Sequence, residues 1–210
     1  MRPLCVFDLD HTLVRSPLDL VRVKREIRAL VDLEGVPLPA GAATWTIGQL
    51  IEAARAHRAP LAATCWAICL EHEEQALAAA AAEPGAREAV EALHAAGYPL
   101  AVWTNNARAI AERALGACGF DGYFQRLVSR DEAALKPDPA GLRLLEAAFP
   151  GRRIWVVGDS WVDGAAAHAG GAAFIAYGAD PAELARRGVA PRVVLQDLRH
   201  LPAWLRTAAC

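Results

Sequence analysis

An α/β protein is predicted by three features of this 210-residue sequence. Short apolar runs alternate with amphipathic helical segments from residue 85 onward, and one more apolar run stands near the N-terminus, at residues 4–7. A helical pattern without strand-like runs separates the two, over residues 17–82. We therefore expect an open parallel sheet with helices on both faces and an all-helical segment inserted after the first strand.

The N-terminal half accounts for the first strand and the insert. A short apolar run such as residues 4–7 is typical of a buried strand. Helical periodicity then predicts three helices, and alanine, the strongest helix former, needs no special explanation where it repeats near the end of the third. Short linkers on either side make residues 15–84 a helical cap on an α/β core of residues 1–14 and 85–210. The three predicted helices are residues 18–34, 44–57 and 61–81.

After Pro84-Gly85 the pattern changes to alternating helices and strands. Such alternation predicts parallel strands joined by helical crossovers, in a Rossmann-like sheet that the N-terminal strand must also join. The predicted helices are residues 86–96, 107–117, 139–149 and 161–169, and the strands are residues 99–103, 124–129, 154–157 and 172–177.

Composition limits the partners and the compartment. With 54% hydrophobic residues the chain can form a sizeable core, and 22 basic against 24 acidic side chains give a formal charge of -2. This balance indicates neither a nucleic acid nor an anionic membrane as a partner. No apolar run is long enough to span a bilayer, and no secretory signal is recognisable, so we expect a cytoplasmic protein. Its five cysteines have no metal-ligand spacing and are expected to be reduced thiols: Cys5, Cys65, Cys69, Cys118 and Cys210.

Two carboxylates follow the first strand directly. Side chains alternate along a strand, so Asp8 and Asp10 can project the same way while Leu9 turns to the opposite side. Two like charges this close are costly unless a cation lies between them or one keeps a proton. A metal, a phosphoryl group or both are therefore expected at this strand end.

Other polar residues follow other predicted strands, and ligands of open parallel sheets bind beyond the carboxyl ends of the strands. Thr104-Asn105-Asn106 follows the second strand, Lys136 comes after the third, and Asp159 and Asp163 follow the fourth. We expect these groups to converge with Asp8 and Asp10 on one crevice. Four carboxylates, a lysine and a threonine hydroxyl suit a hard divalent cation together with a phosphoryl group.

The order of these residues resembles the four motifs of the haloacid dehalogenase superfamily. The matching segments are Asp8-x-Asp10-x-Thr12, Thr104, Lys136-Pro137 and Gly158-Asp159-Ser160-x-x-Asp163. The helical insert is similar to the cap of the phosphoglycolate phosphatase-like branch, and the resemblance covers nearly the whole chain.

The resemblance implies a Mg²⁺-dependent phosphatase acting on a small phosphorylated metabolite. Asp8 would attack phosphorus to form an aspartyl-phosphate, and Asp10 would exchange protons with the leaving alcohol and the water. Thr104, Asn105 and Lys136 would hold the phosphate. The metal would be bound by Asp8, the backbone carbonyl of Asp10 and Asp159, with Asp163 either binding through water or orienting Lys136.

Several alternatives stay open at this level. Within the superfamily, the acid at Asp10 disfavours dehalogenation but leaves a sugar phosphomutase, a pyrophosphatase or a nucleotidase. A phospho-acceptor signalling module resembling a receiver domain is less favoured, because such modules have no helical insert. The identity of the substrate, the choice between monomer and homodimer, and the roles of His11 and Trp161 are not determined by the sequence.

Overall fold

The computed structural model describes residues 1–208, so Cys210 lies outside the described residues. The chain divides into two compact units. One comprises Met1–Ser16 together with the chain from Ala80, and the other is Pro17–Ala79. Four cysteines of the described part, Cys5, Cys65, Cys69 and Cys118, are free and buried.

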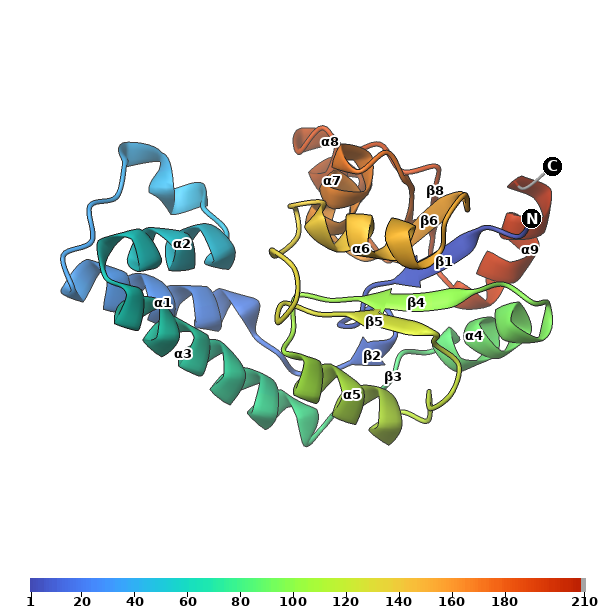
Figure 1. The fold of residues 1–210 in the computed structure, drawn as a ribbon, viewed down its shortest axis with the longest axis horizontal. Coiled ribbons are helices and arrows are strands. Elements are labelled where there is room, and N and C mark those ends of the chain that lie inside the picture. The colour runs from blue at the N-terminus through green and yellow to red at the C-terminus, as the bar shows by residue number, and fades with distance from the viewer. Residues whose placement is uncertain (209–210) are drawn as a thin grey trace. The chain divides into compact units, whose positions relative to one another are not determined.

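A six-stranded parallel sheet forms the centre of the first unit, within the part of the chain that the structure describes (Figure 1). The N-terminal strand lies between two later ones, with Phe7 beside Val102 on one side and Val157 on the other. This arrangement confirms the predicted α/β fold class. In spatial order the strands are β5 (Arg126–Val128), β4 (Leu100–Trp103), β1 (Leu4–Phe7), β6 (Ile154–Gly158), β7 (Ala173–Tyr177) and β8 (Val193–Leu195).

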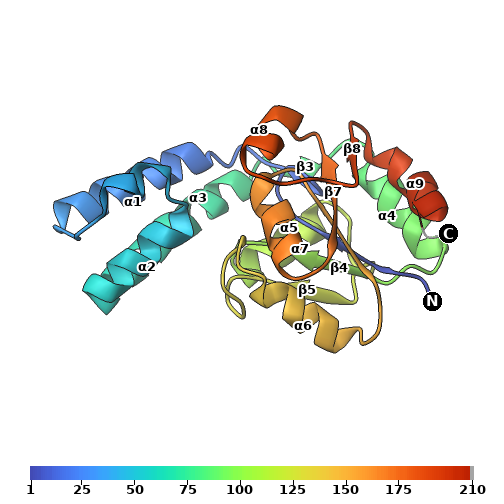
Figure 2. The same cartoon turned by 90° about the horizontal axis from the view of Figure 1, so that it is seen from above.

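Helices cover both faces of this sheet, which explains why its strands are apolar throughout (Figures 1 and 2). Leu4 and Val6 point to one face, in a buried cluster with Leu142 of α6. Trp155 points to the other face, where its ring meets Trp204 of α9 edge-on at 5.1 Å between centroids. On the first face lie α6 (Ala140–Ala148), α7 (Trp161–Ala169) and α8 (Pro181–Arg186); on the second lie α4 (Ala86–Ala95), α5 (Arg108–Ala117) and α9 (Leu201–Ala208).

A short antiparallel ribbon corrects one sequence-based expectation. The predicted helix 61–81 is wrong at its end, because Ala81–Ala82 is a strand, β3, paired with β2 (Val14–Arg15). The main-chain N–H of Glu83 continues this pairing by donating to the carbonyl of Leu13 at 2.9 Å. The pairing partner lies far away in the sequence, so long-range hydrogen bonding overrides the helix propensity of the alanine run.

The second unit, Pro17–Ala79, is built from helices around its own apolar core. Thr46 explains why α2 begins later than the predicted residue 44, since Thr46 caps that helix in a reciprocal exchange with Gln49. Leu50, Ile51 and Cys65 are fully buried in this core. The helices are α1 (Leu20–Leu33), a 3₁₀ turn (Ala40–Thr44), α2 (Ile47–His57) and α3 (Ala59–Leu77). Among the described residues, none of the helices has the length and apolar character that crossing a bilayer requires.

Candidate active site

The predicted site residues gather at the carboxyl edge of the sheet. Asp8 follows β1, Thr104 follows β4 and Asp159 follows β6, and these three strands are neighbours. Lys136 reaches the same edge from the segment after β5, because its ammonium contacts the Asp8 side chain. Parallel pairing of adjacent strands thus brings together residues that are far apart in the sequence.

A buried ammonium group lies at the centre of this cluster. Lys136 is 4% exposed, and its Nζ donates to Asp8 Oδ1 at 2.5 Å and to Asp163 Oδ1 at 2.6 Å. It also donates to the main-chain carbonyl of Trp103 at 2.9 Å. Burial acts to lower the pKa of Lys136, but the carboxylates of Asp163 and Asp8 outweigh burial and raise that pKa above its usual value. Lys136 is therefore a permanent cation held between two acids.

Three carboxylates form a set that fits a hard divalent cation. Oxygens of Asp8, Asp159 and Asp163 all lie within 4.8 Å of one another. Burial raises the pKa of Asp8, and Lys136 opposes that rise. Burial and then repulsion from Asp163 raise the pKa of Asp159 to about 7. A divalent cation among these oxygens would relieve both effects, and all-oxygen donors are those that Mg²⁺ prefers.

Asp163 is already engaged through both of its oxygens. One accepts from Lys136, and the other accepts from the main-chain N–H of Ser160 at 3.1 Å and from its hydroxyl at 2.6 Å. The side chain is 1% exposed. Of the two roles expected for Asp163, the contacts favour orienting Lys136.

Asp10 has different partners from Asp8. Its carboxyl accepts from the side-chain amide of Asn106 at 2.7 Å and from the hydroxyl of Ser16 at 3.1 Å. Burial raises the pKa of Asp10, and these two hydrogen bonds oppose the rise. The next residue, His11, has a φ of 57°, a left-handed backbone that glycine adopts freely and histidine tolerates. Histidine thus fits the tight turn that follows the acid.

The loop after β4, which begins at Thr104, is hydrogen-bonded to the backbone of Lys136. The Thr104 hydroxyl oxygen accepts from the main-chain N–H of Asn106 at 3.1 Å. The amide of Asn105 forms two hydrogen bonds with the backbone of Lys136, accepting from its N–H at 2.8 Å and donating to its carbonyl at 3.2 Å. Asn105 lies in the loop before α5, which begins at Arg108 with Ala107 as its N-cap. The Asn105 side chain fixes the position of Lys136.

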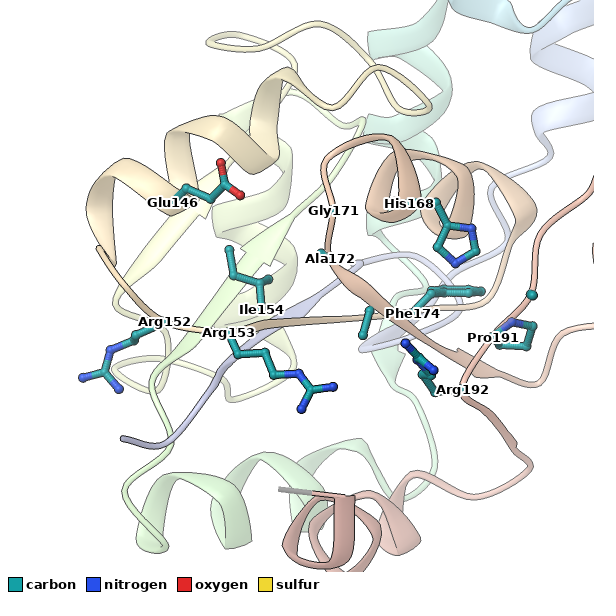
Figure 3. A pocket seen from close by; sticks show the side chains of 12 residues that line it. Glu146, Arg152, Arg153, Ile154, His168, Gly171, Ala172, Phe174, Pro191 and Arg192 are labelled. Atoms are coloured by element: carbon teal, nitrogen blue, oxygen red, sulfur yellow. The ribbon is translucent and has the colours of Figure 1, made fainter. Parts of the chain in front are cut away.

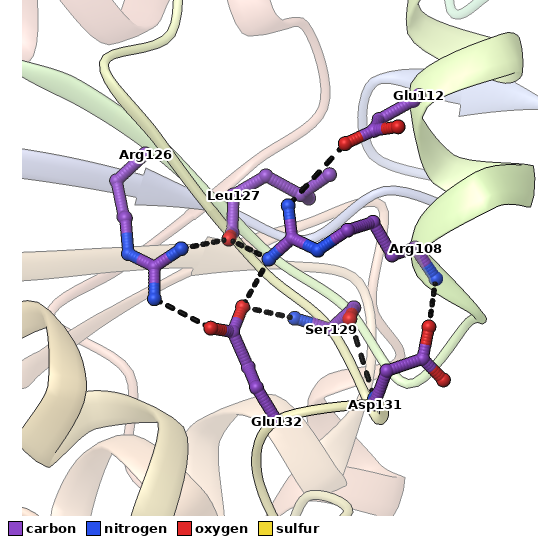
Figure 4. Close-up of polar contacts among 7 residues, drawn as sticks. All are labelled: Arg108, Glu112, Arg126, Leu127, Ser129, Asp131 and Glu132. Carbon is purple, nitrogen blue, oxygen red and sulfur yellow. Dashed lines mark hydrogen bonds and ion pairs between the residues drawn. The ribbon is translucent and has the colours of Figure 1, made fainter.

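An ion-pair network holds the segment that leads to Lys136 (Figure 4). Glu132 accepts from the guanidinium of Arg126 at 2.5 Å and also pairs with Arg108. The main-chain N–H of Arg108 donates to Asp131 at 2.8 Å, and its guanidinium donates to the carbonyl of Leu127 at 2.9 Å. These contacts tie the start of α5 and strand β5 to the loop before Lys136.

Sequence reasoning placed Asn106 at the strand end without giving it a role, and it missed Ser16 and Glu132. Asn106 was visible as the second amide after Thr104, so its position at a strand end was a usable signal. Ser16 and Glu132 lie in segments with no such mark, and their contacts depend on side-chain geometry.

Comparisons with a protein family, with individual proteins and with solved structures all find hydrolases of one kind. The sequence profile of a family described as haloacid dehalogenase-like hydrolase matches residues 3–171. A plasmid-borne phosphoglycolate phosphatase of Cupriavidus necator is 34% identical, covering 97% of this chain and 93% of that protein. A phosphoglycolate phosphatase of Cereibacter sphaeroides is 33% identical over 83% of this chain and 84% of that protein. In structure, a predicted phosphoglycolate phosphatase from Haemophilus somnus superposes with a TM-score of 0.68 at 24% identity, covering 97% of both chains.

Proposed function

Because the chain belongs to the haloacid dehalogenase-like hydrolase family and is a phosphatase, we propose that it hydrolyses a small phosphate monoester through an aspartyl-phosphate on Asp8, with Mg²⁺ as its metal. The observation that carries this proposal is the buried Lys136 ammonium between Asp8 and Asp163. It supplies positive charge beside the carboxylate that attacks, where the negative phosphoryl group must approach.

The metal ligands are assigned from the donor set. Asp8 and Asp159 offer carboxylate oxygens, and Asp163 belongs to the same cluster but uses both of its oxygens for Lys136 and Ser160. We therefore assign direct ligation to Asp8, Asp159 and, from the family resemblance, the main-chain carbonyl of Asp10. Asp163 orients Lys136 or binds the metal through water. When bound, Mg²⁺ neutralises charge on the phosphoryl oxygens.

Two carboxyl groups divide the chemistry. Asp8 attacks phosphorus in its ionised form, which the ammonium of Lys136 favours, and the oxygen of the leaving alcohol takes a proton from Asp10 as its bond to phosphorus breaks. A water molecule then gives a proton to Asp10 and attacks the phosphorus on Asp8, which releases phosphate and restores the Asp8 carboxylate. The raised pKa of Asp10 supports this assignment, since an acid must hold its proton before transfer.

The phosphate is held by the remaining residues of the cluster. The Thr104 oxygen already accepts a hydrogen bond from Asn106, so its own O–H is available to donate to a phosphoryl oxygen. Lys136 already donates to Asp8, Asp163 and the Trp103 carbonyl, so it exchanges one of these acceptors for a second phosphoryl oxygen. Main-chain N–H groups of the loop that contains Asn105 can donate to other oxygens.

Substrate choice is assigned to the helical unit. We propose that Pro17–Ala79 acts as a cap that closes over the phosphate ester and recognises the leaving group. Phosphoglycolate is the first substrate to test, because two relatives that share 34% and 33% identity carry the name phosphoglycolate phosphatase.

The test is a phosphate-release assay over phosphoglycolate, sugar phosphates, nucleotides and pyrophosphate, with Mg²⁺ or with EDTA. We expect Mg²⁺-dependent release that falls by at least about 10³-fold in Asp8→Asn, as removal of a nucleophile does in other enzymes. Asp121→Asn is the matched control, since Asp121 is an exposed carboxylate outside the cluster. Turnover that persists in Asp8→Asn, or in EDTA, contradicts the mechanism.

A further inference from the structure

A cavity of ≈ 500 Å³ opens at the opposite edge of the sheet from the candidate active site (Figure 3). Its lining includes Ile154 and Ala173, the first residues of β6 and β7, and Arg192, which precedes β8. Asp159 follows the other end of β6, so this cavity is separate from the carboxylate cluster. Its volume lies in the range of small-molecule sites.

The charges that line this cavity are mostly positive. The lining contains three arginines, one histidine and one glutamate. The formal charge of the lining is therefore positive even when the histidine is neutral. This contrasts with the whole chain, which has a formal charge of -2. The charged and titratable lining residues are Arg152, Arg153, Arg192, His168 and Glu146.

Two of these arginines are available to a ligand. Arg152 donates to the main-chain carbonyl of Arg2 at 2.7 Å, and in Figure 3 it points away from the others. Arg153 and Arg192 line the cavity from the segments just before β6 and β8. Within residues 1–208, neither of these two guanidinium groups forms an ion pair.

Arg153 is also held in place before any ligand arrives. Its guanidinium carbon lies 4.6 Å from the centre of the Trp155 ring, a cation–π contact. Stacking limits the rotamers of Arg153 but leaves the edge of its planar group free to donate hydrogen bonds. The ordering cost of binding an anion is correspondingly reduced.

We propose that this cavity is a second binding site, for a small organic phosphate. The phosphate group lies between Arg153 and Arg192, because a dianion matches two guanidinium forks better than a single carboxylate does. The carbon part of the ligand contacts the apolar lining, which includes Ile154, Phe174 and Pro191.

Benzylphosphonate tests this site, because its phosphorus–carbon bond resists a phosphatase and its ring provides an apolar part. Binding is measured by titration calorimetry on the full chain in EDTA, so that no bound metal draws the phosphonate into the active site. We expect one site, weakened by about tenfold or more in Arg153→Met and in Arg192→Met, since hydrogen bonds to charged groups are lost. Glu146→Gln should tighten binding, because it removes a negative charge from the cavity lining.

Arg186→Met is the matched control, because it removes an exposed arginine of α8 that pairs with Glu183 and does not line the cavity. Its affinity should stay within about twofold of wild type. No binding, or equal binding by the wild type and both cavity variants, overturns the proposal. Equal affinity for benzylmalonate, which carries two carboxylates in place of the phosphonate, overturns the assignment to phosphate.

Discussion

Replacing Lys136 with methionine tests whether this lysine is the counter-ion of the buried carboxylates. Methionine keeps the length and the apolar stem but removes the ammonium that contacts Asp8 and Asp163 at 2.5 and 2.6 Å. Breaking a buried ion pair by removing one partner costs about 3–5 kcal/mol, because the other charge is left buried and uncompensated. Domains are stable by only about 5–15 kcal/mol, so the variant should fold but with a much lower urea midpoint.

The cost should also depend on pH in a defined direction. Without Lys136, the pKa of Asp8 rises further in the folded protein, and Asp159 already has a pKa of about 7. Acids whose pKa is raised by folding bind protons more tightly when folded, so they lower the stability as pH rises from about 4 through their folded pKa values. The difference between wild type and Lys136→Met should therefore be larger at pH 8 than at pH 5.

The measurement is urea unfolding in EDTA, followed by circular dichroism at both pH values. The matched control is Lys24→Met, the other lysine of the chain, whose ammonium makes one exposed hydrogen bond to the carbonyl of Ala43. That change should cost no more than about 0.5 kcal/mol. Adding Asp163→Asn to Lys136→Met should recover about 1–3 kcal/mol, because one buried charge disappears. A cost for Lys136→Met equal to that of Lys24→Met, or the same at both pH values, refutes the counter-ion interpretation.

Three other outcomes are expected. Asn106→Ala should lower kcat by about 10- to 100-fold with little change in KM, because Asp10 loses a hydrogen bond worth about 1.5–3 kcal/mol; steady-state kinetics that show an unchanged kcat would contradict this. Mg²⁺ should raise the Tm of wild type in proportion to the logarithm of its concentration and leave Asp159→Asn nearly unaffected, and equal shifts in scanning calorimetry would remove Asp159 from the metal site. Arg199 lowers the pKa of Asp197 to about 2 through hydrogen bonds, so this carboxylate stabilises the fold above pH 4 and loses that effect as pH falls toward 2; unfolding of Asp197→Asn should show a smaller loss over that window, and parallel curves would exclude the effect.

The α/β architecture was predictable because apolar strands and amphipathic helices alternate several times along the sequence. Helices and strands from residue 85 onward appear close to their predicted bounds through residue 177. Strand β8 (Val193–Leu195) was not predicted, because a run of three apolar residues is too short to show the periodicity of a strand or a helix. The strand at Ala81–Ala82 was missed because its partner, Val14–Arg15, is distant in the sequence.

The candidate site was predictable to the extent that it follows from topology. Residues such as Asp8 and Thr104 come directly after strands, and neighbouring parallel strands bring their carboxyl ends together. The contact between Asn106 and Asp10 was not predictable, because it joins side chains 96 positions apart and depends on their rotamers. The roles of these residues in catalysis stay predictions that the experiments above test.

The ribbon of β2 and β3 has a consequence for how this chain can vary. Arg15 lies directly opposite Ala81, and antiparallel partners have Cα atoms only about 4.5–5.5 Å apart, a gap that a two-residue turn can close. Pro17–Ala79 therefore replaces the tip of what is topologically a β-hairpin. The entropy of closing a loop grows only with the logarithm of its length, so the hairpin tolerates a short turn or a long folded module alike. The helical unit is thus an exchangeable module, one that can be shortened, extended or swapped while the strands that close the hairpin keep the same register.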